Sequence, residues 1–396
     1  MDWSFLIKNK SSLNVTTDSR KVTSGSIFVA LKGEHFDGND FVEQAKAQGA
    51  EYVICGGNAL RDVQDLARAW RRELGLPILA ITGTNGKTTT KELCAAVLKT
   101  KYNIYYTQGN LNNSLGVPLT LLSITRAHEM AIVEMGASHP GDIKELVDIA
   151  EPNYGLITNV GKAHLQGFGS FEGVMRTKAE LYDYLRAHGG FCFRNTDNPY
   201  LAEMAGGLRT VPYTTGVMPE GTHLVGAYNA ENVSAALRVG LYFGVAEPRA
   251  LAAIRAYIPS NNRSQLMQTE KNTVVIDAYN ANPTSMQAAI NAFDHSTFNI
   301  QLSTANRPKA YLLGAMRELG EYSSLEHQNI VNMLLERKAD KVLLVGEEYT
   351  ATTAPYPIFQ DVEALCEYLR QEPLEGYTIL LKGSRSNQLE KAIPLL

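Results

Sequence analysis

The sequence predicts an α/β protein with three units, each built around its own sheet. The chain has 396 residues, more than a single hydrophobic core usually serves. From Pro77 onward, strand-like and helix-like segments alternate, which is typical of parallel sheets covered by helices. An apolar run at residues 78–82 ends in a glycine turn that leads straight into a helix-forming segment. We therefore expect a small N-terminal α/β domain, a central phosphate-binding parallel sheet and a C-terminal Rossmann-like domain.

The composition is that of a soluble globular protein, with 44% hydrophobic and 20% charged residues. The formal net charge of −4 offers no basic surface, so nucleic acid is not expected as a partner. No apolar run reaches about 18 residues and the start lacks a basic, apolar leader, so neither a membrane span nor export is expected. The four cysteines are far apart without a C-x-x-C pair. This spacing indicates reduced thiols in a cytoplasm.

Residues 1–76 predict the first, small α/β unit. Its expected strands are residues 26–31 and 52–54, with a helix at 41–49 between them. Ser19 and Arg20 precede these segments, and a Ser-Arg pair in a turn can hold a diphosphate or a uracil ring. The alternative for this pair is a surface turn with a solvated arginine.

The second unit, residues 77–258, begins with a candidate phosphate loop. Gly83 and Gly86 lack a Cβ, so backbone N–H groups can converge on an anion at the positive end of the helix expected at 88–99. Lys87 supplies a cation and Thr88 a hydroxyl for Mg2+. In the common G-x-x-x-x-G-K-[ST] pattern four residues separate the two glycines, whereas here only two residues separate Gly83 from Gly86. The loop is therefore a shortened variant. A glycine turn with a solvated lysine is the alternative.

Polar side chains follow two further strands of this unit, expected at residues 130–133 and 155–158, with a helix at 142–150. In parallel sheets, ligands bind outside the carboxyl ends of the strands. Glu134 follows the first of these strands, and Asn159 and His164 follow the second. Metal or phosphate binding is therefore expected at this edge. The alternatives are a capping or solvated acid and a locally bonded histidine.

Three other features of the second unit are polar. The loop at residues 107–116 is rich in amides, which can bind a polar substrate or form Asx turns. Lys178 lies on a helix expected at 173–188, where a lysine is usually solvated. Asn229 and Asn232 precede a helix expected at 233–243 and can contact an adenine edge, or Asn229 can cap that helix.

The third unit, residues 259–396, follows a polar interval and predicts a small Rossmann-like sheet of four strands. The expected strands are residues 273–277, 310–313, 341–345 and 377–381, and the helices are 284–293, 324–336 and 362–370. No G-x-G-x-x-G motif occurs, so a nicotinamide or flavin cofactor is not expected. Asp277 can bind ribose hydroxyls, and Lys382 with Arg385 can hold a carboxylate.

Taken together, these motifs resemble the Mur ligases of bacterial cell-wall synthesis along the whole chain. The loop at residues 83–89 is similar to the ATP loop of that family, but folylpolyglutamate synthases share this loop. Three other stretches are more selective: residues 109–113 with 116–118, 134–136 with 139–141, and 277–283. They are similar to the branch of the family that joins D-Ala-D-Ala to UDP-MurNAc-tripeptide.

The resemblance implies a role for each candidate residue. ATP would be bound by Gly83, Thr84, Asn85, Gly86, Lys87, Thr88, Thr89, Asn229, Asn232, Arg263 and Asp277. The other substrates would be bound by Ser19, Arg20, Asn110, Asn112, Asn113, Tyr279, Asn280, Asn282, Lys382, Ser384 and Arg385. Two Mg2+ ions would be held by Thr88, Glu134, His164 and a carbamylated Lys178. The catalytic residues would be Lys87, Lys178, His164 and Glu134.

The implied activity is ATP-dependent amide synthesis. The substrate carboxylate would take the γ-phosphate of ATP to form an acyl phosphate, and the amine of D-Ala-D-Ala would then displace phosphate to give the UDP-MurNAc-pentapeptide. The third unit would close over ATP and exclude water. A cytoplasmic monomer is expected.

One position departs from the family pattern. The third domain usually shows Leu-Gly-Asp-Met, whereas this chain has Ala315 in place of the aspartate. Glu318 or Glu321 can take over the missing carboxylate, and an active enzyme improved by Ala315→Asp is the expectation. Two alternatives stay open: another amide ligase of the Mur or folylpolyglutamate type, and a catalytically weakened nucleotide-binding regulator.

Overall fold

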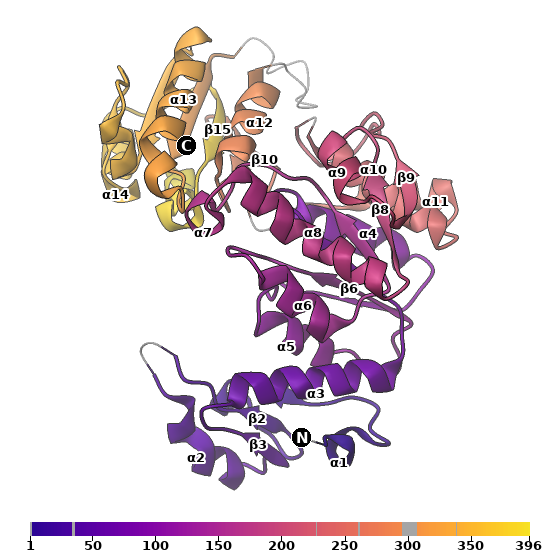
Figure 1. Cartoon of the computed structure of the whole chain (residues 1–396). Helices are drawn as coiled ribbons and strands as arrows, with labels where there is room; N and C mark the ends of the chain where they lie inside the picture. Colours follow the sequence, from indigo (N-terminus) through magenta and orange to yellow (C-terminus); the bar gives the residue numbers. More distant parts are fainter. Residues whose placement is uncertain (1, 34–35, 227, 260–261, 295–306, 338) are drawn as a thin grey trace.

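The computed structural model describes residues 2–33, 36–226, 228–259, 262–294, 307–337 and 339–396. It contains three sheets that follow one another along the chain (Figure 1). Among the described strands, all ladder pairs are parallel except that between β10 and β11. The predicted α/β class with three sheet-centred units is confirmed. In the described part of the chain, no helix has the length and apolar character needed to cross a membrane.

The first sheet is small and has the order β1-β2-β3. Its strands are β1 (Val15–Thr16), β2 (Ile27–Val29) and β3 (Tyr52–Ile54), and its helices are α1 (Ser4–Ile7), α2 (Val42–Ala47) and α3 (Ala59–Leu74). The two predicted strands and the predicted helix are present. β1 and the long helix α3 were not predicted.

Helix α3 joins the first unit to the second. Its apolar residues recur at helical spacing and are fully buried, namely Val63, Leu66, Ala67 and Trp70. The indole Nε1 of Trp70 donates a hydrogen bond to the carbonyl of Ile124 at 2.9 Å. One hydrophobic core therefore runs from the small sheet through α3 into the second unit.

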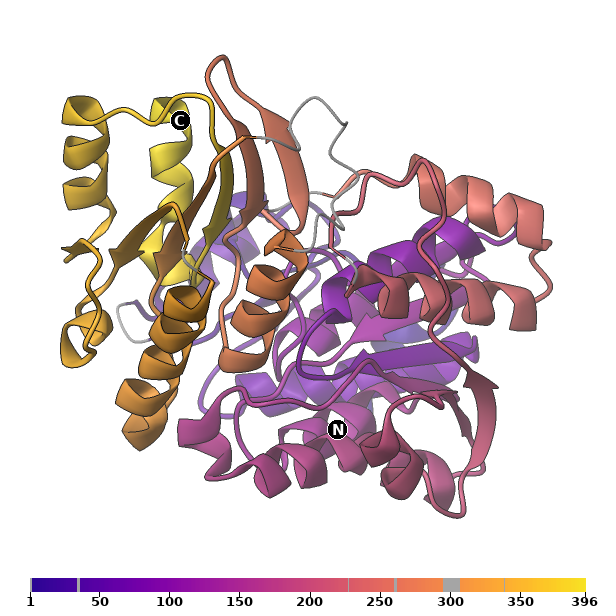
Figure 2. The ribbon, with the colours of Figure 1, turned by 90° about the horizontal axis from the view of Figure 1, so that it is seen from above.

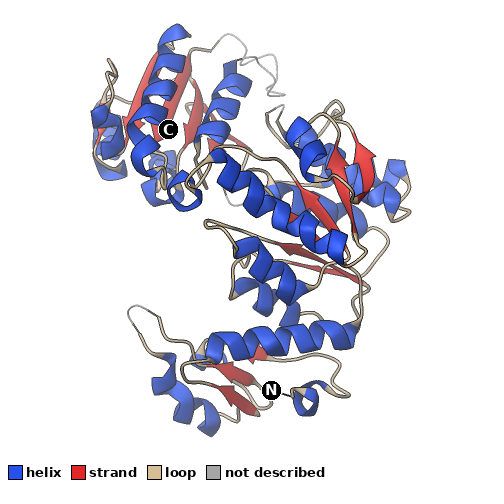
Figure 3. Cartoon of the chain, viewed as in Figure 1, coloured by secondary structure: helices blue, strands red, loops and turns tan. Residues whose placement is uncertain are grey.

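The second sheet has six strands in the order β5-β6-β4-β7-β8-β9, with helices on both faces (Figure 3). The strands are β4 (Ile78–Thr82), β5 (Ile104–Tyr106), β6 (Met130–Glu134), β7 (Tyr154–Ile157), β8 (Phe191–Asn195) and β9 (Arg209–Tyr213). The helices are α4 (Lys87–Leu98), α5 (Gly116–Leu122), α6 (Asp142–Ala150), α7 (Leu165–Phe168), α8 (Phe171–Ala187), α9 (Pro199–Met204), α10 (Asn229–Tyr242) and α11 (Glu247–Ala256). β5, β8, β9, α5, α7, α9 and α11 were not predicted.

Strand β4 lies at the centre of this sheet and is buried along its whole length. Alternate residues face opposite cores, because successive side chains of a strand point to opposite faces. Ile78 and Ala80 pack into one core and Leu79 and Ile81 into the other. β4 pairs with β6 and β7, so the loops that follow these three strands meet at one edge.

The third sheet has the order β10-β11-β15-β12-β13-β14. Its strands are β10 (Gln265–Gln268), β11 (Thr273–Asp277), β12 (Lys309–Gly314), β13 (Lys341–Val345), β14 (Ile358–Phe359) and β15 (Thr378–Lys382), with helices α12 (Pro283–Asp294), α13 (Ser323–Glu336) and α14 (Val362–Gln371). The prediction of four strands is wrong, because β10 and β14 extend the sheet on either side. The last strand, β15, lies between β11 and β12.

The third unit lies beside the second and away from the first (Figures 1 and 2). The segment that precedes and includes α7 contacts the third unit directly. The backbone N–H of Lys162 donates to Thr284 Oγ1 at 3.0 Å, and that of Gln166 donates to the carbonyl of Glu318 at 3.1 Å. The carboxyl edge of the second sheet therefore faces the third unit.

Candidate active site

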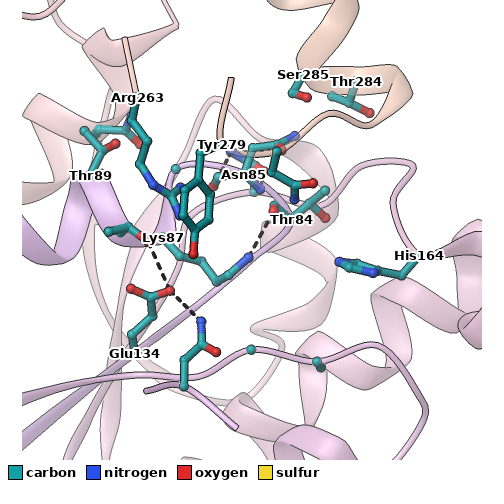
Figure 4. Close-up of a pocket in the computed structure, with 18 of the residues that line it drawn as sticks. Thr84, Asn85, Lys87, Thr89, Glu134, His164, Arg263, Tyr279, Thr284 and Ser285 are labelled. Carbon is teal, nitrogen blue, oxygen red and sulfur yellow. Dashed lines mark hydrogen bonds between the residues drawn. The ribbon is translucent and has the colours of Figure 1, made fainter. Parts of the chain in front are cut away.

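A cavity of about 780 Å3 lies between the second and third units (Figure 4). Its walls include many of the predicted site residues: Thr84, Asn85, Gly86, Lys87, Thr88, Thr89, Asn110, Asn112, Asn113, Glu134, His164, Asn229, Asn232, Arg263, Asp277, Tyr279, Asn280 and Lys382. Segments far apart in the sequence thus meet around one space, which is large enough for a nucleotide.

The phosphate loop joins β4 to α4. Neighbouring atoms leave no room for a side chain at either of its two glycines. Gly83 has φ +140°, and a Cβ there would lie 2.0 Å from Thr158 Oγ1. Gly86 has φ +77°, and a Cβ there would lie 2.4 Å from Asn232 Oδ1. The first N–H groups of α4 have no partner within the helix, so the loop presents donors and a positive helix end to an anion.

Asn159 holds the phosphate loop in place. The backbone N–H of Thr84 donates to the carbonyl of Asn159 at 2.9 Å, and the backbone N–H of Asn85 donates to Asn159 Oδ1 at 3.0 Å. The hydroxyl of Thr158 donates to the carbonyl of Asn85 at 2.6 Å. The residues that follow the neighbouring strand β7 thus hold the loop through hydrogen bonds.

Lys87 rests on the loop itself. Its Nζ donates to the carbonyls of Gly83 at 2.8 Å and Thr84 at 3.1 Å. Burial lowers the pKa of Lys87 to about 8, partly offset by the Glu134 carboxylate. The solvated-lysine alternative is therefore wrong. A phosphate bound at the loop would form an ion pair with this ammonium, in place of its hydrogen bonds to the two neutral carbonyls.

Glu134, at the end of β6, is 1% exposed and receives hydrogen bonds from two sides. Its Oε1 accepts from Thr88 Oγ1 at 3.2 Å and from Asn112 Nδ2 at 2.8 Å. No group of three or more His, Cys, Asp or Glu able to hold a metal occurs among the described residues. A hydroxyl and one carboxylate nevertheless fit Mg2+, which completes its shell with water and substrate phosphates.

His164 connects the second unit to the third. It precedes α7 with φ +49°, and its Nδ1 contacts Glu318 Oε2. Burial lowers the pKa of this imidazole, while Glu318 opposes that shift. The histidine is therefore not locally bonded within its own loop, but reaches across to the third unit.

Lys178 lies on α8 and is 2% exposed. Its Nζ lies 5.4 Å from the centre of the Phe168 ring. Burial, with the charge of Lys87 as a smaller cause, lowers the pKa of Lys178 to about 7. The alternative of a solvated helix lysine is wrong. Lys178 does not line the cavity, but it is close enough to the cavity-lining Lys87 for that charge to lower its pKa.

Asn229 and Asn232 are both buried on the first turn of α10. Asn229 Nδ2 donates to the carbonyl of Val225 at 2.7 Å, and Asn232 Nδ2 donates to Asn229 Oδ1 at 2.8 Å. Asn232 Oδ1 in turn accepts from Thr90 Oγ1 at 3.0 Å. The capping alternative for Asn229 is wrong, because Tyr228 occupies the N-cap and no side chain caps the helix.

Asn282 of the third unit faces the phosphate loop. Its Nδ2 donates to Asn85 Oδ1 at 2.8 Å, and Asn85 Nδ2 returns a longer bond at 3.4 Å. Its own Oδ1 accepts from the backbone N–H of Ser285 at 2.8 Å and so caps α12. This amide pair joins the loop to the third unit.

Tyr279 also extends from the third unit, above the loop (Figure 4). The guanidinium of Arg263 lies 3.7 Å from its ring centre and that of Arg385 lies 5.4 Å away. In the same unit, the buried Lys382 donates from Nζ to Asp277 Oδ2 at 2.7 Å and to the carbonyl of Asn280 at 3.1 Å. Lys382 thus already holds a carboxylate of its own chain.

Comparison with known proteins decides which family has this arrangement. Residues 13–87 match the profile described as Mur ligase family, catalytic domain, residues 81–218 match the Mur ligase middle domain, and residues 262–385 match the Mur ligase, glutamate ligase domain. The chain is 33% identical to UDP-N-acetylmuramoyl-tripeptide--D-alanyl-D-alanine ligase of Bacillus subtilis (strain 168), over 96% of this chain and 92% of the relative. The chain belongs to the Mur ligase family.

Two further relatives agree with this assignment. The ligase of the same name from Escherichia coli (strain K12) is 32% identical over 96% of this chain and 93% of the relative. The crystal structure of MurF ligase from Thermotoga maritima in complex with ADP has a TM-score of 0.84 at 26% identity and covers 98% of both chains. The three-domain Mur ligase architecture is thus confirmed.

Some predicted site residues of this Mur ligase lie off the cavity. Ser19 and Arg20 form part of a short 3-10 helix in the first unit, and Arg20 is exposed and paired with Asp18. This geometry matches the surface-turn alternative. Gly83, Asn282, Ser384 and Arg385 are also absent from the wall, although Asn282 and Arg385 contact residues that form it.

Ala315, where the resemblance leads us to expect an aspartate, is fully buried in the hydrophobic core of the third unit and does not line the cavity. Of the two possible substitutes, Glu318 lines the cavity and Glu321 does not. Glu318 therefore lies at the cavity, where it contacts His164.

The position of Ala315 gives a stability prediction. Two atoms lie within 3.0 Å of the point where a Cβ on Gly346 would stand: the Cβ of Ala315 and the buried Oε2 of Glu348. The Glu348 carboxylate pairs with Arg317 through Oε1, and its Oε2 has no hydrogen-bonding partner among the described residues. Ala315→Asp would bury a second carboxylate there, so we expect a loss of about 2–4 kcal/mol in the free energy of unfolding and no gain in activity. Chemical denaturation checks this, with Ala315→Asn as the uncharged control. A stable, more active Ala315→Asp enzyme would contradict it and support the expectation from sequence.

Proposed function

We propose that this Mur ligase joins D-Ala-D-Ala to UDP-MurNAc-tripeptide at the expense of ATP and forms the UDP-MurNAc-pentapeptide, a peptidoglycan precursor. Relatives that match over nearly the whole chain are named for this reaction. The observation that carries the proposal is the cavity itself. The phosphate loop with Glu134 lines it from the second unit, and Asp277, Tyr279 and Asn280 line it from the third unit.

ATP would bind with its phosphates at the loop. The N-terminal N–H groups of α4 and the ammonium of Lys87 face this position, so the negative charge that builds up during phosphoryl transfer is neutralised by groups already in place. Asn229 and Asn232 would lie towards the adenine, and Asp277 and Arg263 would contact the nucleotide from the third unit.

Mg2+ would be held by Thr88 and Glu134, whose oxygens meet at 3.2 Å. The ion supplies charge neutralisation at the phosphates. A second ion would need His164 and Lys178. As an ammonium, Lys178 has no lone pair for a cation, whereas its carbamate would offer oxygens, and the lowered pKa makes the reactive neutral amine available.

Each of the three units would bind a different substrate. Residues 1–76 would bind the UDP moiety, residues 77–258 would bind ATP, and residues 259–396 would close over ATP and bind the incoming dipeptide. The contacts of Asn85 with Asn282 and of His164 with Glu318 link the second and third units. Such closure protects an acyl phosphate from water.

The two alternatives predict different outcomes in one assay. Phosphate release is measured with UDP-MurNAc-tripeptide and ATP, with and without D-Ala-D-Ala. The proposed ligase releases phosphate only when both substrates are present. Release with a folate and glutamate instead would support the related amide ligase, and ATP binding without release in any mixture would support a regulator.

Arg385 provides a test of dipeptide binding. Its guanidinium is exposed, has no carboxylate partner among the described residues and contacts only the Tyr279 ring. It is therefore available for the terminal carboxylate of D-Ala-D-Ala. We expect Arg385→Ala to raise the KM for D-Ala-D-Ala about tenfold and to leave that for ATP little changed.

The control for this experiment is Arg370→Ala, an exposed arginine of the same unit that pairs with Glu367. An equal loss of apparent affinity for ATP and dipeptide in Arg385→Ala would indicate a structural role through Tyr279 instead.

A further inference from the structure

Lys91 is a buried lysine that none of the predicted roles includes. It is 0% exposed, and its Nζ has no hydrogen-bonding partner among the described residues. The nearest carboxylate oxygens are Glu92 Oε1 at 3.4 Å and Glu134 Oε2 at 3.6 Å, and the Tyr106 ring centre lies 5.7 Å away. An ammonium without hydrogen bonds is unfavourable in a protein interior, so an apolar side chain would serve packing better here.

The position of Lys91 on helix α4 determines which residues its side chain can contact. Lys91 follows Thr88 by three residues on α4, so both side chains lie on the same helix face. Helix α4 contacts β6, and both side chains reach Glu134 at the end of that strand. The two side chains therefore approach one carboxylate from neighbouring positions.

The two oxygens of Glu134 have different surroundings as a result. Oε1 accepts hydrogen bonds from Thr88 and Asn112. Oε2 is buried, has no hydrogen-bonding partner among the described residues and faces the ammonium of Lys91. The charge of Lys91 thus fixes the rotation of the carboxylate and leaves Oε1 beside the Thr88 hydroxyl.

We propose that Lys91 is a positioning residue that makes Glu134 a one-oxygen metal ligand and so favours Mg2+ over Ca2+. Mg2+ is small and requires near-octahedral single-oxygen ligands, whereas Ca2+ accepts a carboxylate through both oxygens. While Oε2 is held by Lys91, Glu134 offers only Oε1. The inference rests on the proposed function, because it assumes that Glu134 binds the metal that accompanies the nucleotide.

The test measures metal preference directly. The full-length protein is loaded with ADP and Mn2+, and the Mn2+ released by added Mg2+ or Ca2+ is followed by electron paramagnetic resonance. We expect Lys91→Met to lower the preference for Mg2+ over Ca2+ about tenfold, as is typical when a partner of a metal ligand is lost. Lys99→Met is the matched control, because Lys99 lies at the end of the same helix and contacts the same Tyr106 ring, at 4.3 Å, but is exposed.

A double variant separates this role from simple packing. If Lys91 acts through Glu134, adding Lys91→Met to Glu134→Gln causes no further change in metal preference. An unchanged preference in folded Lys91→Met, or an equal shift in the Glu134→Gln background, would overturn the inference. Circular dichroism verifies folding, and Lys91→Gln replaces Lys91→Met if the latter does not fold.

The result is independent of the peptide substrates. The metal preference is measured with ADP alone, so it does not require turnover. A wild-type protein that releases no phosphate with UDP-MurNAc-tripeptide and D-Ala-D-Ala would defeat the proposed function, whereas an active wild type with the same metal preference as Lys91→Met would defeat only the role of Lys91.

Discussion

Lys87→Ala is expected to lower phosphate release at least about a hundredfold while the protein stays folded, because such electrostatic contacts typically contribute this much to rate. Within the described residues, the Lys87 ammonium donates hydrogen bonds only to the carbonyls of Gly83 and Thr84. The substitution removes these two hydrogen bonds but no member of the hydrophobic cores, so the fold should be retained.

Phosphate release, ADP binding and thermal unfolding measure this prediction, with Lys99→Ala as a control for the loss of a lysine from the same helix. The positive charge is present below the pKa of about 8 and is lost above it. The kcat/KM for ATP in the wild type should therefore fall as the pH rises through about 8. Near-normal turnover in folded Lys87→Ala would remove this lysine from the mechanism.

Lys178→Ala is the second variant with a large expected effect. A bare ammonium close to bound cations would be repelled, whereas a carbamate would bring an anion to the same position. We expect activity to fall about a hundredfold or more even with Mg2+ in excess, because the variant lacks the carbamate oxygens that would hold the second Mg2+. Protein incubated with labelled bicarbonate should show a carbamate 13C signal that is absent from the variant.

The pH dependence of this signal has a definite sign. Only the neutral amine reacts with CO2, and the pKa of about 7 makes it abundant above that pH, so the signal should weaken as the pH falls below about 7. Lys144→Ala, which removes an exposed lysine of α6, should keep both signal and activity. Full activity in Lys178→Ala, or an unchanged signal, would leave the metals to Thr88, Glu134 and His164.

Before it is carbamylated, Lys178 should lower the free energy of unfolding. Its pKa is about 7 in the folded protein and has a reference value of 10.5, so the unfolded chain binds more protons between these values. Stability therefore rises with pH over this window. In bicarbonate-free buffer near pH 8, Lys178→Met should unfold at a higher temperature than the wild type.

Much of the fold follows from local sequence. The strands β3, β11 and β13 and the helix α6 begin and end where their apolar patterns predict, because each pattern matches the period of its element over its whole length. The edge strands β5 and β14 are short and partly exposed, so their patterns are weak. The helical spacing of Val63, Leu66 and Trp70 was a usable signal for α3 that the prediction missed.

The sequence by itself determined the chemistry at the centre of the site. A glycine turn after an apolar strand fixes the phosphate loop, and parallel strands must end at the same edge of their sheet. The meeting of Lys87, Glu134 and His164 at one cavity follows from these local signals alone. The family motifs then identify the branch to which the chain is similar.

Only the tertiary structure decided which charged side chains form ion pairs and which are buried away from solvent. Lys382 meets Asp277 because β15 lies between β11 and β12, an order that no local pattern specifies. Lys91 and Lys178 occupy ordinary helical positions, and packing against β6 and Phe168 is what buries them. Burial, charge pairing and pKa depend on neighbours distant in the chain, and they enter only when the sheets and helices assemble.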